Sequence, residues 1–396
     1  MNIRQAVILA GGRGERMRPF TDTMPKPMVS VRGKPFLEHL VELLKEQGIR
    51  EIVMLLGYLP DKITEHFGDG SRWGIHITYA IGDVLDETGS RVRNAKELLA
   101  PKFLLMYADN YWPLNMKKME ALYERKKILA TTTVYSNKDG GGEYGPENNV
   151  FVDEKGMVRL YDKTRKDKRL NGVDIGFFLL ERKVLDLMPE HNFSFEQVIL
   201  PALIQRNELA AFRTDHPYYP ITSPDRLPKA EAFLTPKKVV FLDRDGVISR
   251  SMPPHAYVKK WQEFKFLPGA IEGLSLLTES GYQIFIVTNQ RGIARGLMTE
   301  RDLAGIHENM IRELKQQGVR IDGIYHCPHE INAGCECRKP KPGLLYRAAR
   351  EHYLDLTKSI FIGDTEGDCK AAETAGCRPI IMPTDGSLFE IVRSLP

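Results

Sequence analysis

The stretch LAGGRGERMRPFTDTMPKPM, Leu9 to Met28, follows the apolar run AVILA and offers glycines at positions 11, 12 and 14. Glycine lets backbone amides approach a phosphate without a side chain in the way. Arg16 and Lys26 add positive charge. Pro25 and Pro27 flank Lys26 and stiffen the backbone that carries it. A glycine cluster alone is usually a structural turn, but the whole run predicts a strand followed by a nucleotide-binding loop.

Apolar runs of strand length recur along the chain and alternate with stretches of helical pattern. Such runs are typical of buried parallel strands, and the alternation indicates an α/β fold throughout, with two Rossmann-like domains. In residues 36–48, Leu40, Leu43 and Leu44 fall on one face and a glycine ends the pattern, which predicts a helix. The runs are AVILA before Gly11, IVMLLG from Ile52, KFLLMYAD up to Asp109, VVFLD up to Asp243, IFIVTN up to Asn289 and IFIGD up to Asp364.

A break in this alternation falls at LTPKKVVFLD, where a proline and two lysines separate the helical stretch KAEAFL from a new strand. We place the domain boundary near Pro236, with domains at 1–234 and 237–396. The length of 396 residues suits about two to three domains. The polar, glycine-rich stretch DGGGEYGPENN, Asp139 to Asn149, predicts a hairpin or an active-site loop in the first domain.

The composition argues against several classes of partner. The chain has 56 Lys and Arg against 52 Asp and Glu, which is too even for a sequence-independent grip on nucleic acid. The start, MNIRQAVILAGG, is broken by glycines and is typical of neither a signal peptide nor a spanning helix. No later apolar run approaches about 18 residues. We therefore expect a cytoplasmic protein that binds small anions, and neither nucleic acid nor membrane.

The run from Leu9 to Met28 resembles the signature of sugar-1-phosphate nucleotidyltransferases, over most of residues 1–234. In that family a sugar phosphate attacks the nucleotide α-phosphate and pyrophosphate leaves, so catalysis rests on positioning and on charge neutralisation by Mg²⁺ and cationic side chains. The resemblance implies that Arg16 and Lys26 neutralise a nucleoside triphosphate and that Asp109 binds magnesium. It also implies a nucleotide cradle made of Leu9, Ala10, Gly11, Gly12, Arg13 and Gly14.

Two later residues extend this resemblance to the sugar. Lys163, in YDK, matches the lysine of the family's Glu-Lys pair that holds the sugar phosphate, and Asp174, in VDIGFF, falls where the family contacts the sugar. Asp109 could instead cap a following helix. Lys163 lies in a run of charges, LYDKTRKDKRL, that could equally be a solvated loop.

The sequence departs from the family pattern at two places. Many members carry a second magnesium aspartate in a late stretch, and here YYPITSPDRL puts Pro220, which cannot ligate a metal, where that aspartate aligns. The family's Gly-Thr-Ala-Gly segment is reduced to ETGS at residues 87–90. Either another carboxylate such as Asp174 completes the metal site, or transferase activity is slow or lost.

In the second half, FLDRDGV places Asp243 and Asp245 two residues apart at the end of a predicted buried strand. In an extended chain this spacing turns both carboxylates toward the same side. One carboxylate can attack phosphorus while the other protonates the leaving oxygen. A lone pair of this kind could be a surface turn, but polar side chains also follow other predicted strands of the same sheet. These are Thr288, Asn289, Lys339 and Asp364.

This set, in this order, resembles the haloacid-dehalogenase-type phosphatases over essentially all of residues 237–396. The resemblance implies that Asp243 forms an aspartyl phosphate and that Asp245 acts first as acid and then as base. Asp364 would join Asp243 and the backbone of Asp245 on magnesium. We expect Asp368, one helical turn later, to support the site rather than to bind the ion.

The segment CPHEINAGCEC, 327–337, presents three thiols and one imidazole in eleven residues. Three thiolates and one imidazole suit tetrahedral zinc with no open position, hence a structural site. Unliganded loop cysteines are the alternative. Cys369 and Cys377 lie outside this segment and are expected to be ordinary buried residues. The candidate zinc ligands are Cys327, His329, Cys335 and Cys337.

The cluster runs straight into RKPKPG and, together with TNQRGIARG, resembles the D-glycero-D-manno-heptose-1,7-bisphosphate 7-phosphatase branch of the superfamily. Histidinol-phosphate phosphatase shares the zinc loop, but TNQRGIARG fits the heptose enzymes better. The resemblance implies that Arg338 contacts a substrate phosphate beside Lys339.

The two halves together predict a bifunctional enzyme, because a heptose phosphatase makes a heptose 1-phosphate and a nucleotidyltransferase consumes one. The product would be an NDP-heptose for surface glycans, made with GTP or ATP. We expect heptose 1,7-bisphosphate to be a poor transferase substrate, since no cation is evident for its second phosphate. One alternative is a phosphatase regulated by a non-catalytic sugar-nucleotide sensor. Another is a histidinol-phosphate phosphatase fused to an unrelated transferase.

Overall fold

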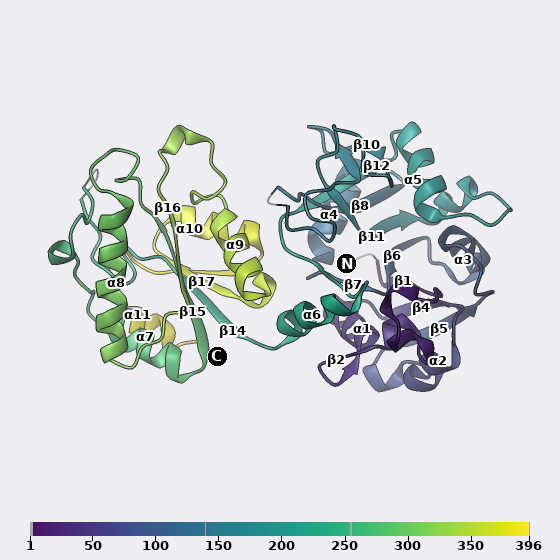
Figure 1. Ribbon diagram of the computed structural model, residues 1–396, viewed down its shortest axis with the longest axis horizontal. Helices are drawn as coiled ribbons and strands as arrows, with labels where there is room; N and C mark the ends of the chain where they lie inside the picture. The colour runs from purple at the N-terminus through teal and green to yellow at the C-terminus, as the bar shows by residue number, and fades with distance from the viewer. Residues whose placement is uncertain (1–2, 139, 254–255, 396) are drawn as a thin grey trace. The chain divides into compact units, whose positions relative to one another are not determined.

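The computed structural model describes residues 3–138, 140–253 and 256–395. The chain divides into two compact units, Met1–Leu234 and Thr235–Pro396, and each contains its own β-sheet with flanking helices (Figure 1). Within the described ranges, none of the helices has both the length and the apolar content needed to cross a bilayer.

The first unit is built on a seven-stranded sheet. Its strands are β1 (Gln5–Ala10), β4 (Glu51–Leu56), β5 (His76–Ile81), β6 (Lys102–Tyr107), β8 (Ala130–Tyr135), β11 (Val173–Glu181) and β12 (Leu209–Thr214), in the order β12-β8-β11-β6-β1-β4-β5. All run in one direction except β11, which lies antiparallel between β6 and β8. The three apolar runs predicted here form β1, β4 and β6, with β4 and β6 flanking β1 in parallel. The segments that follow these three strands therefore meet at one edge of the sheet.

Short ladders and helices complete this unit. The predicted helix over 36–48 forms but ends at Glu46, and the stop residue Gly48 takes a φ of +83°. The stretch KAEAFL is helical as predicted. The helices are α1 (Phe36–Glu46), α2 (Asp61–Phe67), α3 (Thr88–Asn94), α4 (Met116–Lys126), α5 (Phe195–Gln205) and α6 (Leu227–Leu234). The two-stranded ladders are β2 (Ser30–Val31) with β3 (Lys34–Pro35), β7 (Asn110–Tyr111) with β13 (Tyr219–Pro220), and β9 (Val150–Val152) with β10 (Val158–Tyr161).

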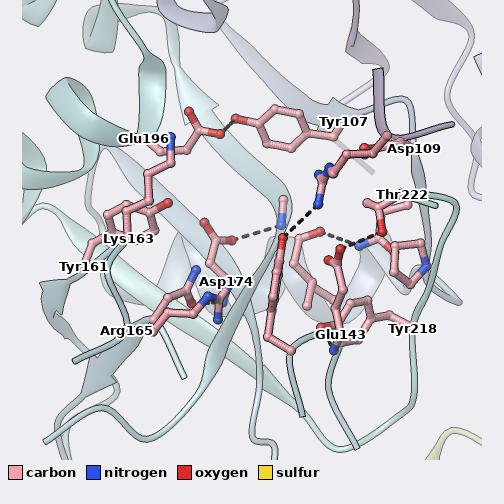
Figure 2. Close-up of a pocket in the computed structure, with 17 residues that line it drawn as sticks. Tyr107, Asp109, Glu143, Tyr161, Lys163, Arg165, Asp174, Glu196, Tyr218 and Thr222 are labelled. Atoms are coloured by element: carbon pink, nitrogen blue, oxygen red, sulfur yellow. Dashed lines mark hydrogen bonds between the residues drawn. The ribbon is translucent and has the colours of Figure 1, made fainter. Parts of the chain in front are cut away.

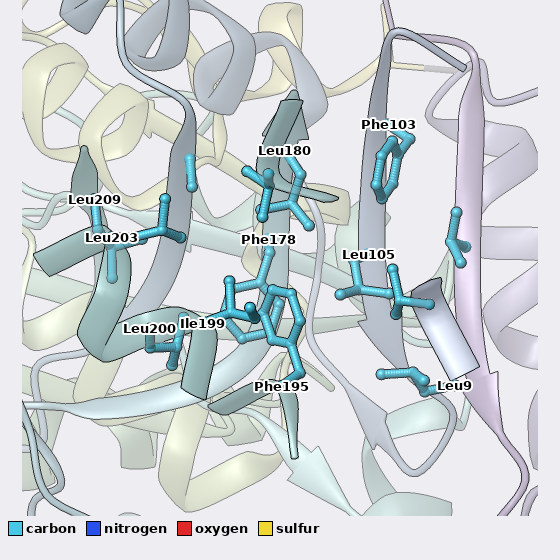
Figure 3. Close-up of a cluster of buried hydrophobic side chains, with 14 of the residues drawn as sticks. Leu9, Phe103, Leu105, Phe178, Leu180, Phe195, Ile199, Leu200, Leu203 and Leu209 are labelled. Atoms are coloured by element: carbon cyan, nitrogen blue, oxygen red, sulfur yellow. The ribbon is translucent and has the colours of Figure 1, made fainter. Parts of the chain in front are cut away.

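Helix α5 is fixed on the sheet by an apolar core, which Figure 3 shows. Phe195, at the start of the helix, is fully buried, and its ring meets the ring of Phe178 on β11 edge-on at 5.4 Å between centroids. Leu200 and Leu203 continue the same face toward the strands. Each such side chain contributes about 1.5–3 kcal/mol by burial, so the first turn of α5 has a defined position.

The second unit has a five-stranded, wholly parallel sheet. Its strands are β14 (Lys238–Leu242), β15 (Tyr282–Asn289), β16 (Gly323–Cys327), β17 (Ile360–Gly363) and β18 (Arg378–Ile381), in the order β16-β15-β14-β17-β18. Its helices are α7 (Ala270–Glu279), α8 (Glu300–Gln316), α9 (Gly343–His352), α10 (Glu366–Ala375) and α11 (Leu388–Val392). The three apolar runs predicted here form β14, β15 and β17, as expected.

Helices cover both faces of this second sheet: α7, α8 and α11 lie on one side, and α9 and α10 on the other (Figure 1). Strand β14 therefore buries both of its faces. Val240 and Leu242 belong to one core, and Val239 and Phe241 belong to the other. A strand buried on both faces reads as an unbroken apolar run, which explains VVFL in the sequence. Asp243 follows at the carboxyl end of this central strand.

Candidate active sites

The glycine-rich loop after β1 lines a cavity of about 570 Å³ in the first unit. All six predicted cradle residues, 9–14, lie on its wall, together with Lys26 and the segment 84–88. Glycine is required at two of these positions. Gly14 has a φ of +64°, and a Cβ on Gly11 would lie 2.3 Å from Cζ of Arg91. We call this cavity the nucleotide pocket.

Arg91 of helix α3 is a wall residue that the sequence did not reveal. Its guanidinium is buried and donates to the carbonyl oxygens of Leu56 and Asp83, each at 2.7 Å, and of Gly11 at 3.4 Å. Burial lowers the pKa of Arg91 below its usual range, against the opposing effect of nearby carboxylates. The side chain thus links the end of β4, the segment before α3 and the glycine-rich loop.

A second cavity, of about 420 Å³, lies beside the first and contains the predicted sugar-binding residues (Figure 2). Lys163 and Asp174 line this cavity, which we call the sugar pocket. Lys163 is exposed as well, so it lies in a solvated loop at the pocket rim. The glycine-rich stretch predicted as a hairpin or active-site loop contributes Glu143, Tyr144 and Asn149. Asp139, the first residue of that stretch, lies outside the described residues.

The two pockets share Tyr107, at the end of β6, and Asp109. Asp109 does not cap a helix, because strand β7 follows it directly, and its Oδ2 lies 2.5 Å from Nζ of Lys26. Pro220 lies beside it: Pro220 pairs with Asn110, and the next residue donates its backbone N–H to the carbonyl of Asp109.

Two cations occupy positions that the sequence did not indicate. Arg16 lines the sugar pocket rather than the nucleotide pocket, where Arg13 lies instead. The left-handed turn at Gly14 redirects the chain, so Nη1 of Arg16 comes within 3.4 Å of the hydroxyl of Tyr144. The guanidinium of Arg165 stacks on the same ring, 3.9 Å from its centroid. The expectation that this pocket has no cation for a second phosphate is therefore wrong.

Asp174 is partly buried on the wall of the sugar pocket. Its Oδ1 accepts hydrogen bonds from the hydroxyl of Thr132 at 2.8 Å and from the N–H of Gly176 at 3.0 Å. Burial raises the pKa of Asp174 to about 7, and these hydrogen bonds only partly oppose the shift. Among the described residues, no cluster of three or more metal-ligating side chains includes Asp174 or Asp109.

In the second unit, the predicted nucleophile Asp243 lies next to a buried lysine. Lys339 Nζ is 2.9 Å from Oδ1 of Asp243 and 2.6 Å from Oδ1 of Asp368. Burial raises the pKa of Asp243 to about 7, with Lys339 opposing and Asp368 adding to the shift. Burial also disfavours the charge on Lys339, but the two carboxylates outweigh it and raise the pKa of that lysine. Asp368 thus pairs with the same lysine as Asp243.

The carboxylate of Asp245 accepts hydrogen bonds from several side chains. Arg244 donates to both of its oxygens, at 3.0 and 2.8 Å, and the amide of Gln290 donates at 2.9 Å. Burial opposes the charge on Asp245, yet Arg244 and these hydrogen bonds prevail and lower its pKa. Arg244 in turn contacts His307 at 3.2 Å, and burial lowers the pKa of that histidine to about 3, so the neutral ring accepts the bond. The sequence revealed neither Arg244 nor His307.

The carboxylates of Asp243, Asp364 and Asp368 lie together and could hold a metal ion. Asp364 also has a buried oxygen, Oδ1, with no hydrogen-bond partner among the described residues. A buried carboxylate oxygen is costly to leave without a partner, and oxygen ligands of this kind suit a hard divalent cation. The donor set therefore fits magnesium. The carboxylate of Asp245 is not part of this group. The resemblance described above implies that only the backbone of this residue binds the ion.

The remaining predicted residues surround this cluster. Thr288 is buried and its hydroxyl accepts from the amide of Gln290 at 2.8 Å. Asn289 exchanges hydrogen bonds with the backbone N–H and carbonyl of Lys339, at 3.1 and 3.2 Å. Arg338 is partly exposed and donates to the carbonyl of His329, so it lies against the cysteine loop.

The predicted zinc ligands converge in the loop after β16. Their nitrogen and sulfur atoms all lie within 4.8 Å of one another, so the cluster could hold a metal ion. Cys327 Sγ is 3.3 Å from Sγ of Cys337 and 3.7 Å from Sγ of Cys335. Cys377 is buried as predicted, but Cys369 is partly exposed beside Glu373, because it lies on the outer face of α10. The clustered ligands are Cys327, His329, Cys335 and Cys337.

Comparison with known proteins finds a match for each of the two units. The family model described as nucleotidyl transferase matches residues 5–218, more than half of the chain, and the model described as polynucleotide kinase 3 phosphatase matches residues 238–377. The second half is 44% identical over 162 residues to a D-glycero-alpha-D-manno-heptose-1,7-bisphosphate 7-phosphatase of Campylobacter jejuni, covering 40% of this chain and 91% of that protein. This chain belongs to the nucleotidyl transferase family and to the heptose-1,7-bisphosphate 7-phosphatase family.

Two further matches complete the comparison. A D-glycero-beta-D-manno-heptose-1,7-bisphosphate 7-phosphatase of Bordetella bronchiseptica is 40% identical over 147 residues, which cover 37% of this chain and 81% of that protein. The name of this protein specifies the beta anomer of the sugar, whereas the name of the Campylobacter protein specifies the alpha anomer. A solved structure of a candidate glucose-1-phosphate thymidylyltransferase from Bacillus anthracis is 19% identical, with a TM-score of 0.51 over 58% of this chain and 94% of that one. That likeness concerns the fold of the transferase unit alone.

Proposed function

We propose that this chain removes the 7-phosphate from D-glycero-D-manno-heptose 1,7-bisphosphate and then joins the resulting heptose 1-phosphate to a nucleotide. The observation that carries the proposal is the junction of two pockets at Tyr107 and Asp109, in a chain whose second unit belongs to the heptose-bisphosphate phosphatase family. A sugar phosphate in one pocket and a nucleotide in the other would meet at that junction, where the transfer requires them.

The residues of the first unit fit the transfer. The glycine-rich loop offers backbone amides to the triphosphate, and Arg13 and Lys26 offset its charge. Lys163 and Arg165 would hold the sugar phosphate in the sugar pocket. Magnesium, when bound between Asp109 and the nucleotide, would neutralise charge on the phosphates, and one carboxylate with substrate oxygens is a usual arrangement for this ion.

The residues of the second unit fit a phosphomonoester hydrolysis in two steps. Asp243 attacks phosphorus and displaces the sugar oxygen, and water then releases phosphate from the aspartyl group. Asp245 would give a proton to the leaving oxygen and later take one from water, which requires the charge of a bound substrate phosphate to raise the pKa that Arg244 lowers in the free protein. Lys339 balances charge beside Asp243. Magnesium bound by Asp243 and Asp364 would add charge neutralisation at the phosphoryl group.

We assign the four-ligand cluster to structural zinc, because three thiols and an imidazole leave no open coordination position. Cysteines that form no disulfide and a nucleoside triphosphate substrate both suit the cytoplasm, where we place the enzyme. The substrates are thus sugar phosphates and a nucleoside triphosphate, and the chain needs no nucleic acid or membrane partner.

The test is a paired release assay on the full chain. Phosphate release is measured with both anomers of heptose 1,7-bisphosphate and with histidinol phosphate, and pyrophosphate release with both anomers of heptose 1-phosphate plus GTP or ATP. We expect phosphate from a heptose bisphosphate and pyrophosphate from a heptose 1-phosphate. Phosphate release without pyrophosphate under any condition would favour the sensor hypothesis, which the proline at position 220 motivates. A preference for histidinol phosphate would refute the proposed substrate.

A further inference from the structure

Glu196, in the first turn of α5, is a carboxylate of the sugar pocket for which the sequence gave no role. Its two oxygens bond to different parts of the site. Oε1 accepts a hydrogen bond from the hydroxyl of Tyr107, which Figure 2 shows. Oε2 accepts from the hydroxyl of Thr88 at 3.1 Å and from that of Ser194 at 2.8 Å.

The bond to Thr88 reaches the nucleotide pocket, because Thr88 ends the segment 84–88 on its wall. Other bonds hold the same segment to the residues just before α5. The side-chain amide of Asn192 accepts from the N–H of Glu87 at 2.8 Å and donates to the carbonyl of Leu85 at 3.0 Å. The hydroxyl of Thr88 also accepts from the N–H of Phe195 at 2.9 Å. A shift of this segment upon nucleotide binding would therefore move the carboxylate of Glu196 or break its bond to Thr88.

The bond to Tyr107 reaches the wall that both pockets share. Burial raises the pKa of Tyr107 well above its usual value, so the phenol is neutral and donates to the carboxylate. The ring rests on Gly176 of β11, where a Cβ would lie 2.4 Å from it. The ring therefore has little room to move on that side, and its hydroxyl is held by Glu196.

We propose that Glu196 is a positioning residue that couples the two pockets, so that binding of the nucleotide strengthens binding of the sugar phosphate and the reverse. This inference rests on the proposed transferase activity. One carboxylate orients the segment 84–88 of the nucleotide pocket through Thr88 and the common wall through Tyr107. A ligand that orders one contact lowers the cost of ordering the other. The negative charge near the start of α5 also favours the helix, but that effect alone would not link two ligands.

The experiment measures the coupling directly by calorimetry on the full chain. The probes are the α,β-methylene analogues of GTP and ATP with Mg²⁺, titrated with and without saturating heptose 1-phosphate. We expect the sugar phosphate to tighten nucleotide binding in the wild-type chain by about 5-fold or more, the usual lower range for coupled sites. Glu196→Gln should lower this ratio toward one, because the amide has a single acceptor oxygen, so at least one of the two hydroxyls loses the oxygen to which it now donates.

Two matched variants separate coupling from folding. Thr88→Val and Tyr107→Phe each remove one of the two bonds to Glu196 and leave the carboxylate in place; Thr88→Val also removes the acceptor of the Phe195 N–H. Each should lower the ratio as far as Glu196→Gln does, and the double variant Thr88→Val/Tyr107→Phe should lower it no further. A wild-type ratio of one, or an unchanged ratio in Glu196→Gln, would overturn the inference. Pyrophosphate release by the wild-type chain is measured alongside: its absence with an intact coupling ratio refutes the proposed function alone.

Discussion

Nζ of Lys26 lies 2.5 Å from Oδ2 of Asp109, and both side chains are mostly buried on the wall of the nucleotide pocket. In the free protein, the cation expected at the triphosphate and the carboxylate expected at magnesium thus neutralise each other. If the proposed roles hold, binding of a magnesium nucleotide would exchange this ion pair for two new ones, Asp109 with the metal and Lys26 with the phosphates. Lys26 should therefore both assist the transfer and compete with the metal.

We predict that Lys26→Met lowers the rate of pyrophosphate release by about 10²-fold or more, because one cation facing the developing charge is lost. The same variant should reach half-maximal rate at a lower Mg²⁺ concentration, since Asp109 no longer has a competing partner. Lys34→Met removes a lysine that pairs with Glu42 at 2.5 Å and serves as control. An unchanged Mg²⁺ dependence in Lys26→Met would refute this competition.

Asp174 provides a pH-dependent prediction of stability. Its pKa of about 7 in the folded chain exceeds the unfolded value of about 3.9, so the native state binds more protons between these limits. The free energy of unfolding should therefore fall as pH rises from about 4 to 7. Asp174→Asn keeps the acceptor for Thr132 but does not titrate, so it should stabilise the transferase unit at pH 8 by on the order of 1–4 kcal/mol, and by about a third as much at pH 5.

The measurement is thermal unfolding of the wild type and Asp174→Asn at pH 5, 6.5 and 8. Glu65→Gln, at an exposed position of α2, is the control. A stability difference that is the same at all three values would show that Asp174 does not titrate in this range.

Asp243→Asn should abolish phosphate release, by about 10⁴-fold or more, as loss of a nucleophile does. Pyrophosphate release should persist, because the two sites lie in separate units with separate apolar cores. Both rates are measured on one preparation, with Glu279→Gln on the exposed side of α7 as control. Phosphate release above about a tenth of the wild-type rate would remove the nucleophile assignment.

The cysteine cluster should hold one zinc ion per chain, and Cys335→Ser should lose it. Because structural metal binding is coupled to folding, the thermal transition of the phosphatase unit should fall by about 5 °C or more. The transition of the transferase unit should not move. Elemental analysis and calorimetry test both points, with Cys369→Ser outside the cluster as control. Wild-type protein without stoichiometric zinc, purified in the absence of chelator, would contradict the assignment.

The sequence predicted those parts of the sites that depend on local order along the chain. Asp243 and Asp364 follow apolar strands that pair in parallel, so their position at one sheet edge follows from the pattern. The ligands of the cysteine cluster lie within eleven residues of sequence, so their closeness in space follows from their spacing. Both predictions needed only the strand periodicity and the spacing of the residues.

Residues that act through contacts between distant segments could not be predicted in this way. Glu196 meets Tyr107 across 89 positions and Thr88 across 108, and neither pair has a local pattern. The sequence around Arg91 does not distinguish it from an exposed arginine of a helix. Only the structure shows that its side chain is buried against Gly11. The place of Arg16 on the wall of the sugar pocket could not be predicted either, because the direction of a loop depends on one left-handed glycine, Gly14, rather than on spacing.

The shared wall constrains how such an enzyme can change. Because Tyr107 and Asp109 belong to both pockets, a substitution there alters the sugar and the nucleotide specificity together. A change of sugar alone, by evolution or by design, must go through residues that line only the sugar pocket, such as Glu143 and Tyr218. A change of nucleotide alone must likewise use the segment 84–86. The junction is thus the least substitutable part of the transferase, and the outer walls are where new specificities can arise.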